Sequence, residues 1–195
     1  MFPVPELNGL VLAGGRSTRM GHDKGLINWH GKPQREYMAD LLKSYCREVF
    51  ISCREDQQLA ITDGGYTALT DNYTDLGPFG ALLSAFELQE NKAWLVVACD
   101  LPLLDKAHLD QLCAERNPVL MATAFEGTDG VAEPLMTIWE PSAYPALLSG
   151  LAAGSSSARS VLLKNEITVL KSTDQQALAN VNSRDEADKI IKSFL

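Results

Sequence analysis

The stretch "WLVVACD", residues 94–100, decides the fold that the sequence predicts. Six consecutive apolar residues are followed by one acid. An uninterrupted apolar run of this length is typical of a parallel strand that helices cover on both faces. The acid that follows would lie at the carboxyl end of that strand, where open α/β sheets bind their ligands. The stretch therefore predicts a central strand and one edge of a site.

Segments that resemble strands and helices alternate on both sides of this stretch. Further strands are expected at residues 7–12, 49–51, 66–70, 119–124, 135–139 and 167–170. Helices are expected at residues 34–45, 79–88, 106–114, 141–151, 158–163 and 183–194. This alternation predicts an α/β three-layer sandwich with a mostly parallel sheet. No repeat, low-complexity tract or linker divides the chain, so residues 1–195 are expected to form a single domain.

Composition and charge exclude several classes of protein. A chain of 195 residues that is 46% hydrophobic and 22% charged is typical of a soluble globular protein. Its net charge of −8 argues against a nucleic-acid polymer as a partner. No apolar run approaches the roughly 20 residues of a membrane span, and the N-terminus lacks a signal-peptide pattern. Four cysteines without a CxxC pair are consistent with free thiols in a cytoplasmic protein.

The loop "LAGGRSTRMGHDKG", residues 12–25, concentrates glycine and positive charge directly after an expected strand. Gly14 and Gly15 let main-chain N–H groups approach a ligand, and successive N–H groups can form an anion-binding concavity. Arg19 and Lys24 add charge that suits a nucleoside triphosphate. The spacing fits neither a Walker A loop nor the G-x-G-x-x-G fingerprint. A glycine-rich turn with solvated arginines is the alternative.

Acidic residues follow two of the expected strands. Asp100 would hold Mg²⁺, which takes carboxylate, water and phosphate oxygens as ligands. The alternative is that Asp100 caps the following turn. Asp71 follows residues 66–70, and Gly77 and Gly80 flank the next helix start. A plain strand–loop–helix connection is the alternative for that segment.

The glycine-rich loop closely resembles the nucleotide-binding signature of the molybdenum cofactor guanylyltransferases, L-A-G-G-x-[ST]-x-R-M-G-x-D-K, over residues 12–24. These enzymes are nucleotidyltransferases with a Rossmann-like, glycosyltransferase-A-type fold, so the resemblance implies that fold. The segment "CDLP" around Asp100 matches the family's metal aspartate, which implies Mg²⁺ as the cofactor. The resemblance covers nearly the whole chain in order and is sharp in three segments.

The resemblance also implies a set of site residues. The catalytic residues would be Lys24, Arg19 and Asp100. The nucleotide-binding residues would be Leu12, Ala13, Gly14, Gly15, Lys24, Ser52, Asp71, Gly77, Asp100 and Asn182. Ser52 stands where the better-known enzymes carry asparagine, which leaves the base preference open. Ser183 and Arg184 replace the Thr-Pro of the family's end motif, and an Asx turn is the alternative for Asn182.

The match on the acceptor side is loose. Residues 133–139 and 155–163 correspond to the family in position more than in sequence. Arg159 would either receive a phosphate of the acceptor or be an ordinary surface arginine.

The resemblance implies transfer of GMP from GTP to molybdenum-bound molybdopterin, which gives the guanine dinucleotide cofactor and pyrophosphate. GTP and molybdopterin would be the small-molecule partners, and transient contact with molybdenum-cofactor assembly proteins also fits. One alternative is another nucleotidyltransferase, acting on a sugar phosphate or using CTP. A second is a catalytically silent nucleotide-binding adaptor. The presence of both Lys24 and Asp100 favours an enzyme.

Overall fold

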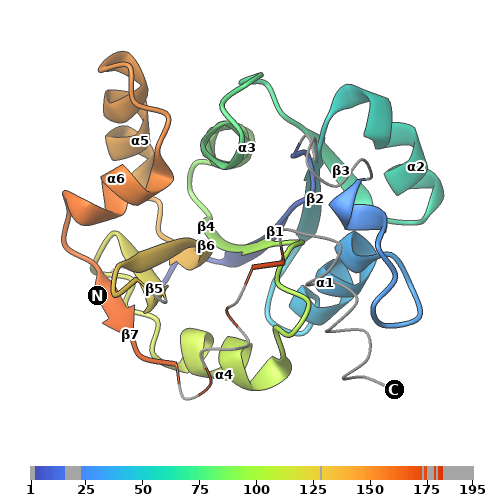
Figure 1. Ribbon diagram of the computed structural model, residues 1–195. Helices are drawn as coiled ribbons and strands as arrows, with labels where there is room; N and C mark the ends of the chain where they lie inside the picture. The colour runs from blue at the N-terminus through green and yellow to red at the C-terminus, as the bar shows by residue number, and fades with distance from the viewer. Residues whose placement is uncertain are drawn as a thin grey trace.

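The computed structural model describes residues 3–15, 23–127, 129–172, 174, 178, 180 and 181. Within these residues seven strands form one sheet in the order β3-β2-β1-β4-β6-β5-β7 (Figure 1). The strands are β1 Leu7–Leu12, β2 Val49–Cys53, β3 Thr67–Thr70, β4 Ala93–Ala98, β5 Ala122–Glu126, β6 Ala132–Trp139 and β7 Thr168–Leu170. All neighbours pair parallel except β6, which runs antiparallel to both β4 and β5. The prediction of a mostly parallel sheet is confirmed.

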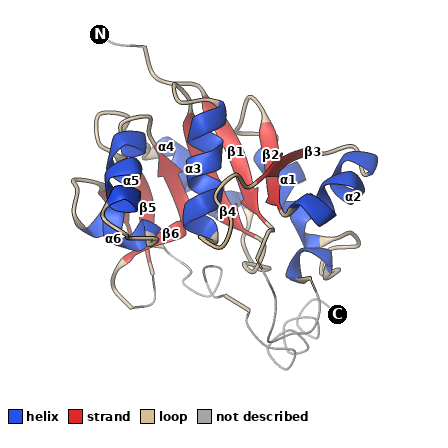
Figure 2. Ribbon diagram, turned by 90° about the horizontal axis from the view of Figure 1, so that it is seen from above, coloured by secondary structure: helices blue, strands red, loops and turns tan. Residues whose placement is uncertain are grey.

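Helices cover both faces of the sheet (Figures 1 and 2). The helices are α1 Gln34–Leu42, α2 Gln58–Asp63, α3 Pro78–Leu88, α4 Lys106–Ala114, α5 Ala143–Ala152 and α6 Ala158–Leu163. Two short 3₁₀ helices, η1 Lys24–Leu26 and η2 Glu55–Gln57, follow β1 and β2. Helices α3, α5 and α6 pack on one face, and α1 and α4 on the other (Figure 1). The three-layer sandwich is therefore confirmed.

Strand β4 contributes to two separate apolar cores, one on each face of the sheet. Trp94 and Val96 pack in the core beneath α3, α5 and α6. Leu95 and Val97 pack in the core beneath α1 and α4. All four side chains are buried, because successive residues of a strand point to opposite faces. The continuous apolar run thus has the two-sided burial that the sequence predicted.

Several element predictions differ from the structure in their bounds; the strand expected at residues 135–139, for example, begins three residues earlier, at Ala132. The helix expected at residues 34–45 ends at Leu42, where the N–H groups of Tyr45 and Cys46 both bond to the Leu42 carbonyl and close a turn. The strand expected from residue 119 begins at Ala122, because a turn occupies the preceding residues. Helix α2 was not predicted, since Ile61 is its one buried residue and gives no periodic signal. The helix expected at residues 183–194 lies outside the described residues.

The helices and the cysteines were also the subject of predictions from the composition. Among the described residues, none of the helices has both the length and the apolar character needed to cross a membrane. All four cysteines are free: Cys53 and Cys99 are buried, and Cys46 and Cys113 are partly buried.

Candidate active site

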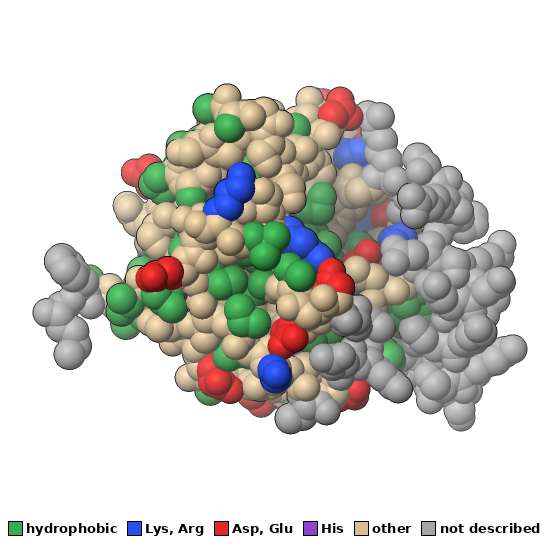
Figure 3. All heavy atoms as spheres, turned by 60° about the vertical axis from the view of Figure 1, so that its left-hand side comes forward, with side chains coloured by type: hydrophobic (Ala, Val, Ile, Leu, Met, Phe, Trp, Pro, Cys, Tyr) green, Lys and Arg blue, Asp and Glu red, His purple; other side chains and the backbone are tan. Residues whose placement is uncertain are grey.

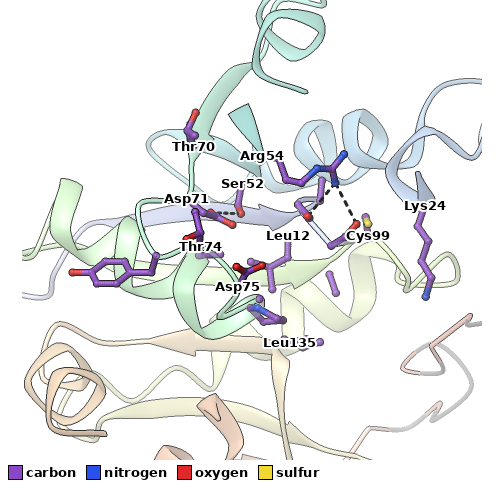
Figure 4. A pocket seen from close by; sticks show the side chains of 18 of the residues that line it. Leu12, Lys24, Ser52, Arg54, Thr70, Asp71, Thr74, Asp75, Cys99 and Leu135 are labelled. Atoms are coloured by element: carbon purple, nitrogen blue, oxygen red, sulfur yellow. Dashed lines mark hydrogen bonds between the residues drawn. The ribbon is translucent and has the colours of Figure 1, made fainter. Parts of the chain in front are cut away.

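A cleft of about 740 Å³ opens at the carboxyl ends of β1, β2, β3 and β4 (Figure 4). The chain passes from β1 to β2 and β3 on one side, then returns to place β4 on the other side of β1. Ligands of open α/β sheets bind at such a reversal of strand order. The cleft is lined by all the described residues that were predicted to bind nucleotide: Leu12, Ala13, Gly14, Gly15, Lys24, Ser52, Asp71, Gly77 and Asp100. Arg19 and Asn182 lie outside the described residues.

The two glycines after β1 serve different purposes. A Cβ atom on Gly14 would come within 3.3 Å of Asp71 Oδ2 and within 3.5 Å of the Cys53 main chain. A Cβ atom on Gly15 would meet nothing within 4 Å. Gly14 therefore lets the start of the loop lie against neighbouring elements, whereas Gly15 leaves the main chain open to the cleft.

Lys24 and Asp100, both predicted to be catalytic, lie side by side. The Lys24 Nζ atom is 3.5 Å from Asp100 Oδ2, and each side chain is 20% exposed. Burial raises the pKa of Asp100, and the lysine opposes that rise. The C-terminal segment joins the two residues, because Lys24 Nζ donates to the Val181 carbonyl at 3.0 Å and the Val181 N–H donates to the Asp100 carbonyl at 2.9 Å.

The second carboxylate oxygen of Asp100 is suited to a cation. Asp100 Oδ1 is buried and has no hydrogen-bond partner. A desolvated carboxylate oxygen without a partner costs free energy that a bound cation would recover. In the described part of the chain, no group of three His, Cys, Asp or Glu side chains could hold a metal ion. These observations fit Mg²⁺, which commonly binds one or two carboxylates and completes its shell with water and substrate phosphates.

Ser52 and Asp71 form a hydrogen-bonded pair across the ends of β2 and β3 (Figure 4). The buried Ser52 hydroxyl donates to Asp71 Oδ1 at 2.8 Å. Burial raises the pKa of Asp71 to about 6, against the opposing effect of that hydrogen bond. The residue at the family's asparagine position therefore orients a carboxylate that faces the cleft.

Two glycines shape the connection from β3 to α3. Gly77 has a φ of +54°, which side chains disfavour, and Pro78 follows as the first helical residue. A Cβ atom on Gly80 would lie 2.4 Å from the Tyr73 carbonyl oxygen. Glycine at both positions thus allows the connection to fold back along the cleft, which Tyr73 also lines.

Sequence reasoning missed Arg54, which lines the cleft directly after β2. Its Nη1 atom donates to the Gly14 carbonyl at 3.2 Å (Figure 4). The expected strand ended at residue 51, whereas β2 continues to Cys53 and so places the arginine at the carboxyl edge of the sheet. Its position immediately after a strand was the one available signal.

The region around Arg159, which the resemblance relates to the acceptor, is formed differently. Arg159 pairs with Asp129 through Nη1, and its Nη2 atom is 3.3 Å from Glu133 Oε2. Burial raises the pKa of Glu133, and the nearby charge of Asp100 adds to the rise. Strand β6 contributes Leu135 to the cleft. Arg159 is thus held by two carboxylates in the described structure.

The sequence is similar to a family of nucleotidyltransferases. The sequence profile of the MobA-like NTP transferase domain matches residues 9–169. A molybdenum cofactor guanylyltransferase from Xanthomonas euvesicatoria pv. vesicatoria is 34% identical over 94% of this chain and 93% of its own. A molybdenum cofactor biosynthesis bifunctional protein from Synechocystis sp. is 33% identical over 94% of this chain. The match covers 53% of the length of that relative.

A solved structure shares the fold of this chain at a lower sequence identity. The crystal structure of molybdopterin-guanine dinucleotide biosynthesis protein A from Archaeoglobus fulgidus superposes with a TM-score of 0.75 at 18% identity. The match covers 96% of this chain and 98% of that one. The expected nucleotidyltransferase fold is therefore confirmed.

Proposed function

The chain belongs to the MobA-like NTP transferase family, and on that basis we propose that it transfers GMP from GTP to molybdenum-bound molybdopterin. The observation that carries the proposal is that Gly14, Gly15, Lys24, Asp71 and Asp100 all line the same cleft. An oxygen of the acceptor phosphate attacks the α-phosphorus of GTP. The bond from the α-phosphorus to the bridging oxygen then breaks, and pyrophosphate leaves.

The glycine loop and Lys24 would bind the leaving phosphates. An in-line displacement at phosphorus depends chiefly on positioning and charge neutralisation. The open main chain at Gly15 lets phosphate oxygens approach amide donors, and Lys24 adds a full positive charge beside them. The nucleophile is a phosphate that is already ionised near neutral pH, so no general base is needed.

Asp100 would serve as the metal ligand. Its Oδ2 atom faces Lys24, while its buried Oδ1 atom has no hydrogen-bond partner. Lys24 favours the ionised carboxylate although burial opposes it. When bound, Mg²⁺ would neutralise charge on the triphosphate. Lys24 and Asp100 thus place one cation and one cation ligand at the same point of the cleft.

The base side of the cleft supports guanine. Asp71 presents a carboxylate, which accepts hydrogen bonds when ionised. Guanine carries two adjacent N–H donors, at N1 and at its exocyclic amino group, which can donate together to one carboxylate, whereas cytosine has one amino donor beside the acceptors N3 and O2. The L-A-G-G form of the loop at residues 12–15 also favours guanylyl over cytidylyl transfer, since the cytidylyl relatives more often carry L-A-A-G.

Incubation of the purified protein with molybdenum-bound molybdopterin, Mg²⁺ and one nucleotide at a time tests the proposal. GTP should give a dinucleotide product and pyrophosphate, and CTP and ATP should give far less. A product from CTP, or from GTP and a sugar phosphate, would assign a different nucleotidyltransferase. Tight GTP binding without any product would instead identify a nucleotide-binding adaptor.

A further inference from the structure

The turn that follows β2 contacts both ends of the glycine loop. At the start of the loop, Arg54 Nη1 donates to the Gly14 carbonyl at 3.2 Å and lies 3.5 Å from the Gly15 carbonyl (Figure 4). At the end of the loop, Gln57 Nε2 donates to Asp23 Oδ2. Gln57 Oε1 in turn accepts from the Arg54 N–H at 2.9 Å, so both contacts come from one small hydrogen-bonded unit.

We propose that Arg54 and Gln57 are positioning residues that hold the two described ends of the glycine loop, residues 12–15 and 23–25, in the geometry a triphosphate requires. The inference rests on the proposed function and deepens it, because it assigns the loop geometry to side chains from outside the glycine signature. The unit formed by residues 54–57 is called the loop bracket below.

The contact at the start of the loop orients main-chain amides. The C=O and N–H groups of a trans peptide point in opposite directions. With the Gly14 carbonyl turned to Arg54, the Gly15 N–H points away from the positively charged guanidinium. Two successive glycines have little conformational preference of their own, so contacts from outside must fix them. Arg54 supplies such a contact.

Arg54 is itself held in place. Its Nε atom donates to Asp56 Oδ1 at 3.0 Å and its Nη2 atom to Asp56 Oδ2 at 3.1 Å. A bidentate pair of this kind fixes the guanidinium plane and leaves Nη1 directed at the loop carbonyls. The arginine therefore reaches the loop as an oriented donor rather than as a free charge.

The contact at the end of the loop acts on the residue before Lys24. Asp23 accepts from the Gly25 N–H at 2.9 Å and so caps η1, which begins with Lys24. Arg35, only 4% exposed, lies 4.0 Å from the same carboxylate. Gln57 adds a third contact to Asp23. Fixing Asp23 fixes the adjacent Lys24, which pairs with Asp100 and is proposed to bind the triphosphate.

Gln57 separates positioning from direct phosphate binding. It is neutral, 6% exposed and absent from the lining of the cleft. Any effect that it has on a bound phosphate must therefore pass through Arg54 or Asp23. Asp56 also distinguishes positioning from direct phosphate binding. Its negative charge lines the cleft, so removing that charge would strengthen phosphate binding if Arg54 contacted phosphate directly. If Arg54 acts by positioning, loss of Asp56 weakens binding instead.

Calorimetric titration of the full chain with inorganic tripolyphosphate and with GMP tests the loop bracket. The variants are Arg54→Gln, Gln57→Leu and Asp56→Asn. The matched control is Arg47→Gln, which removes one exposed charge just before the amino end of β2, far from the cleft. Arg54→Gln and Gln57→Leu should each weaken tripolyphosphate binding about tenfold, and Asp56→Asn about threefold. GMP binding should change less than about twofold, and the control should match the wild type.

Each outcome decides the matter. Unchanged tripolyphosphate binding in Arg54→Gln and Gln57→Leu would overturn the inference. Equal losses of GMP and tripolyphosphate binding would also overturn it, because they would indicate a general structural role. Tighter tripolyphosphate binding in Asp56→Asn would overturn it too, because that result would indicate direct contact between Arg54 and phosphate. If Gln57→Leu fails to fold, Arg54→Gln and Asp56→Asn still decide. A wild-type protein that binds tripolyphosphate but not GTP would contradict the proposed function and leave the bracket standing.

Discussion

In one half of the sheet, β3, β2, β1 and β4 all run parallel, whereas in the other half β6 runs antiparallel to both of its neighbours. The parallel half brings four carboxyl ends to one edge, and the loops that follow them supply most of the cleft. In the mixed half, β5 and β7 run in the same direction as those four strands and β6 runs in the opposite direction; β6 contributes Leu135 to the cleft. The loops after the four adjacent parallel strands therefore supply most of the residues that line the cleft.

The polar groups of the two halves also differ. In the parallel half, Asp100 Oδ1 is buried without a hydrogen-bond partner, and burial raises the pKa of Asp71 to about 6. In the mixed half, Arg159 is paired with Asp129 and Glu133. Figure 3 turns the side bearing α5 and α6 forward, and there hydrophobic side chains gather at the centre with charged groups beside them. The carboxylates of Asp71 and Asp100 thus lie, desolvated, where the nucleotide is proposed to bind.

The largest effect is expected from Asp100→Asn in the parallel half. The substitution removes the charge that would hold the metal ion, so pyrophosphate release should fall roughly 10²–10³-fold. The main-chain bond to Val181 does not depend on the side chain, so the melting temperature should be preserved. Turnover within a few-fold of the wild type would show that the metal assignment is wrong.

The next effect is on stability and concerns the rim of the same cleft. Gly80→Ala would bring a Cβ atom to 2.4 Å from a main-chain oxygen, which cannot move as a side chain could. Chemical denaturation should report a loss of about 1–3 kcal/mol in the free energy of unfolding. Gly150→Ala in α5 is the control, because its Cβ would meet neighbours at ordinary distances of 3.6 and 3.7 Å. Equal stabilities of the two variants would refute this packing argument.

A smaller effect follows from the pKa of Asp71. In the unfolded chain an aspartate has a pKa of about 3.9, whereas burial raises that of Asp71 to about 6 in the folded protein. The folded state therefore binds the proton more tightly, and this contribution to stability is lost as the pH rises from about 4 to 6.

Asp71→Asn should remove that pH dependence. Relative to the wild type, the variant should gain about 1–2 kcal/mol in the free energy of unfolding between about pH 4 and pH 7, a figure reduced for partial exposure. Urea titrations across this range measure the difference. A gap between the two proteins that is constant with pH would contradict the assigned burial.

The smallest effect is expected in the mixed half. Arg159→Gln removes ion pairs made by a side chain that is 36% exposed, so the melting temperature should change by less than about 3 °C. GTP affinity, measured by calorimetry, should stay within about twofold of the wild type. Loss of GTP binding in this variant would contradict the assignment of nucleotide binding to the parallel half of the sheet.

The parts of the fold that could be predicted are those with a strong local signal. Strand β1 and helices α4 and α6 have the predicted boundaries, and β4 is displaced by one residue. A continuous apolar run or a clear helical period determines each of them. Helix α2 lacks such a signal, because Ile61 is its one buried residue.

Some residues of the candidate site could likewise be predicted from the sequence, and others could not. Residues next to a predicted strand end, such as Gly14, Asp71 and Asp100, could be assigned because parallel strands bring their carboxyl ends together. Arg54 and Gln57 could not, because their contacts join residues 34 to 40 positions apart in the sequence. Such long-range hydrogen bonds depend on the folded arrangement and leave no local pattern.

Anomalous diffraction from a crystal soaked with Mn²⁺ and a non-hydrolysable GTP analogue tests the central claim most directly. A manganese peak is expected beside Asp100, with the triphosphate against Gly14, Gly15 and Lys24. An empty cleft, or a metal bound elsewhere while Asp100 remains paired with Lys24 alone, would contradict it.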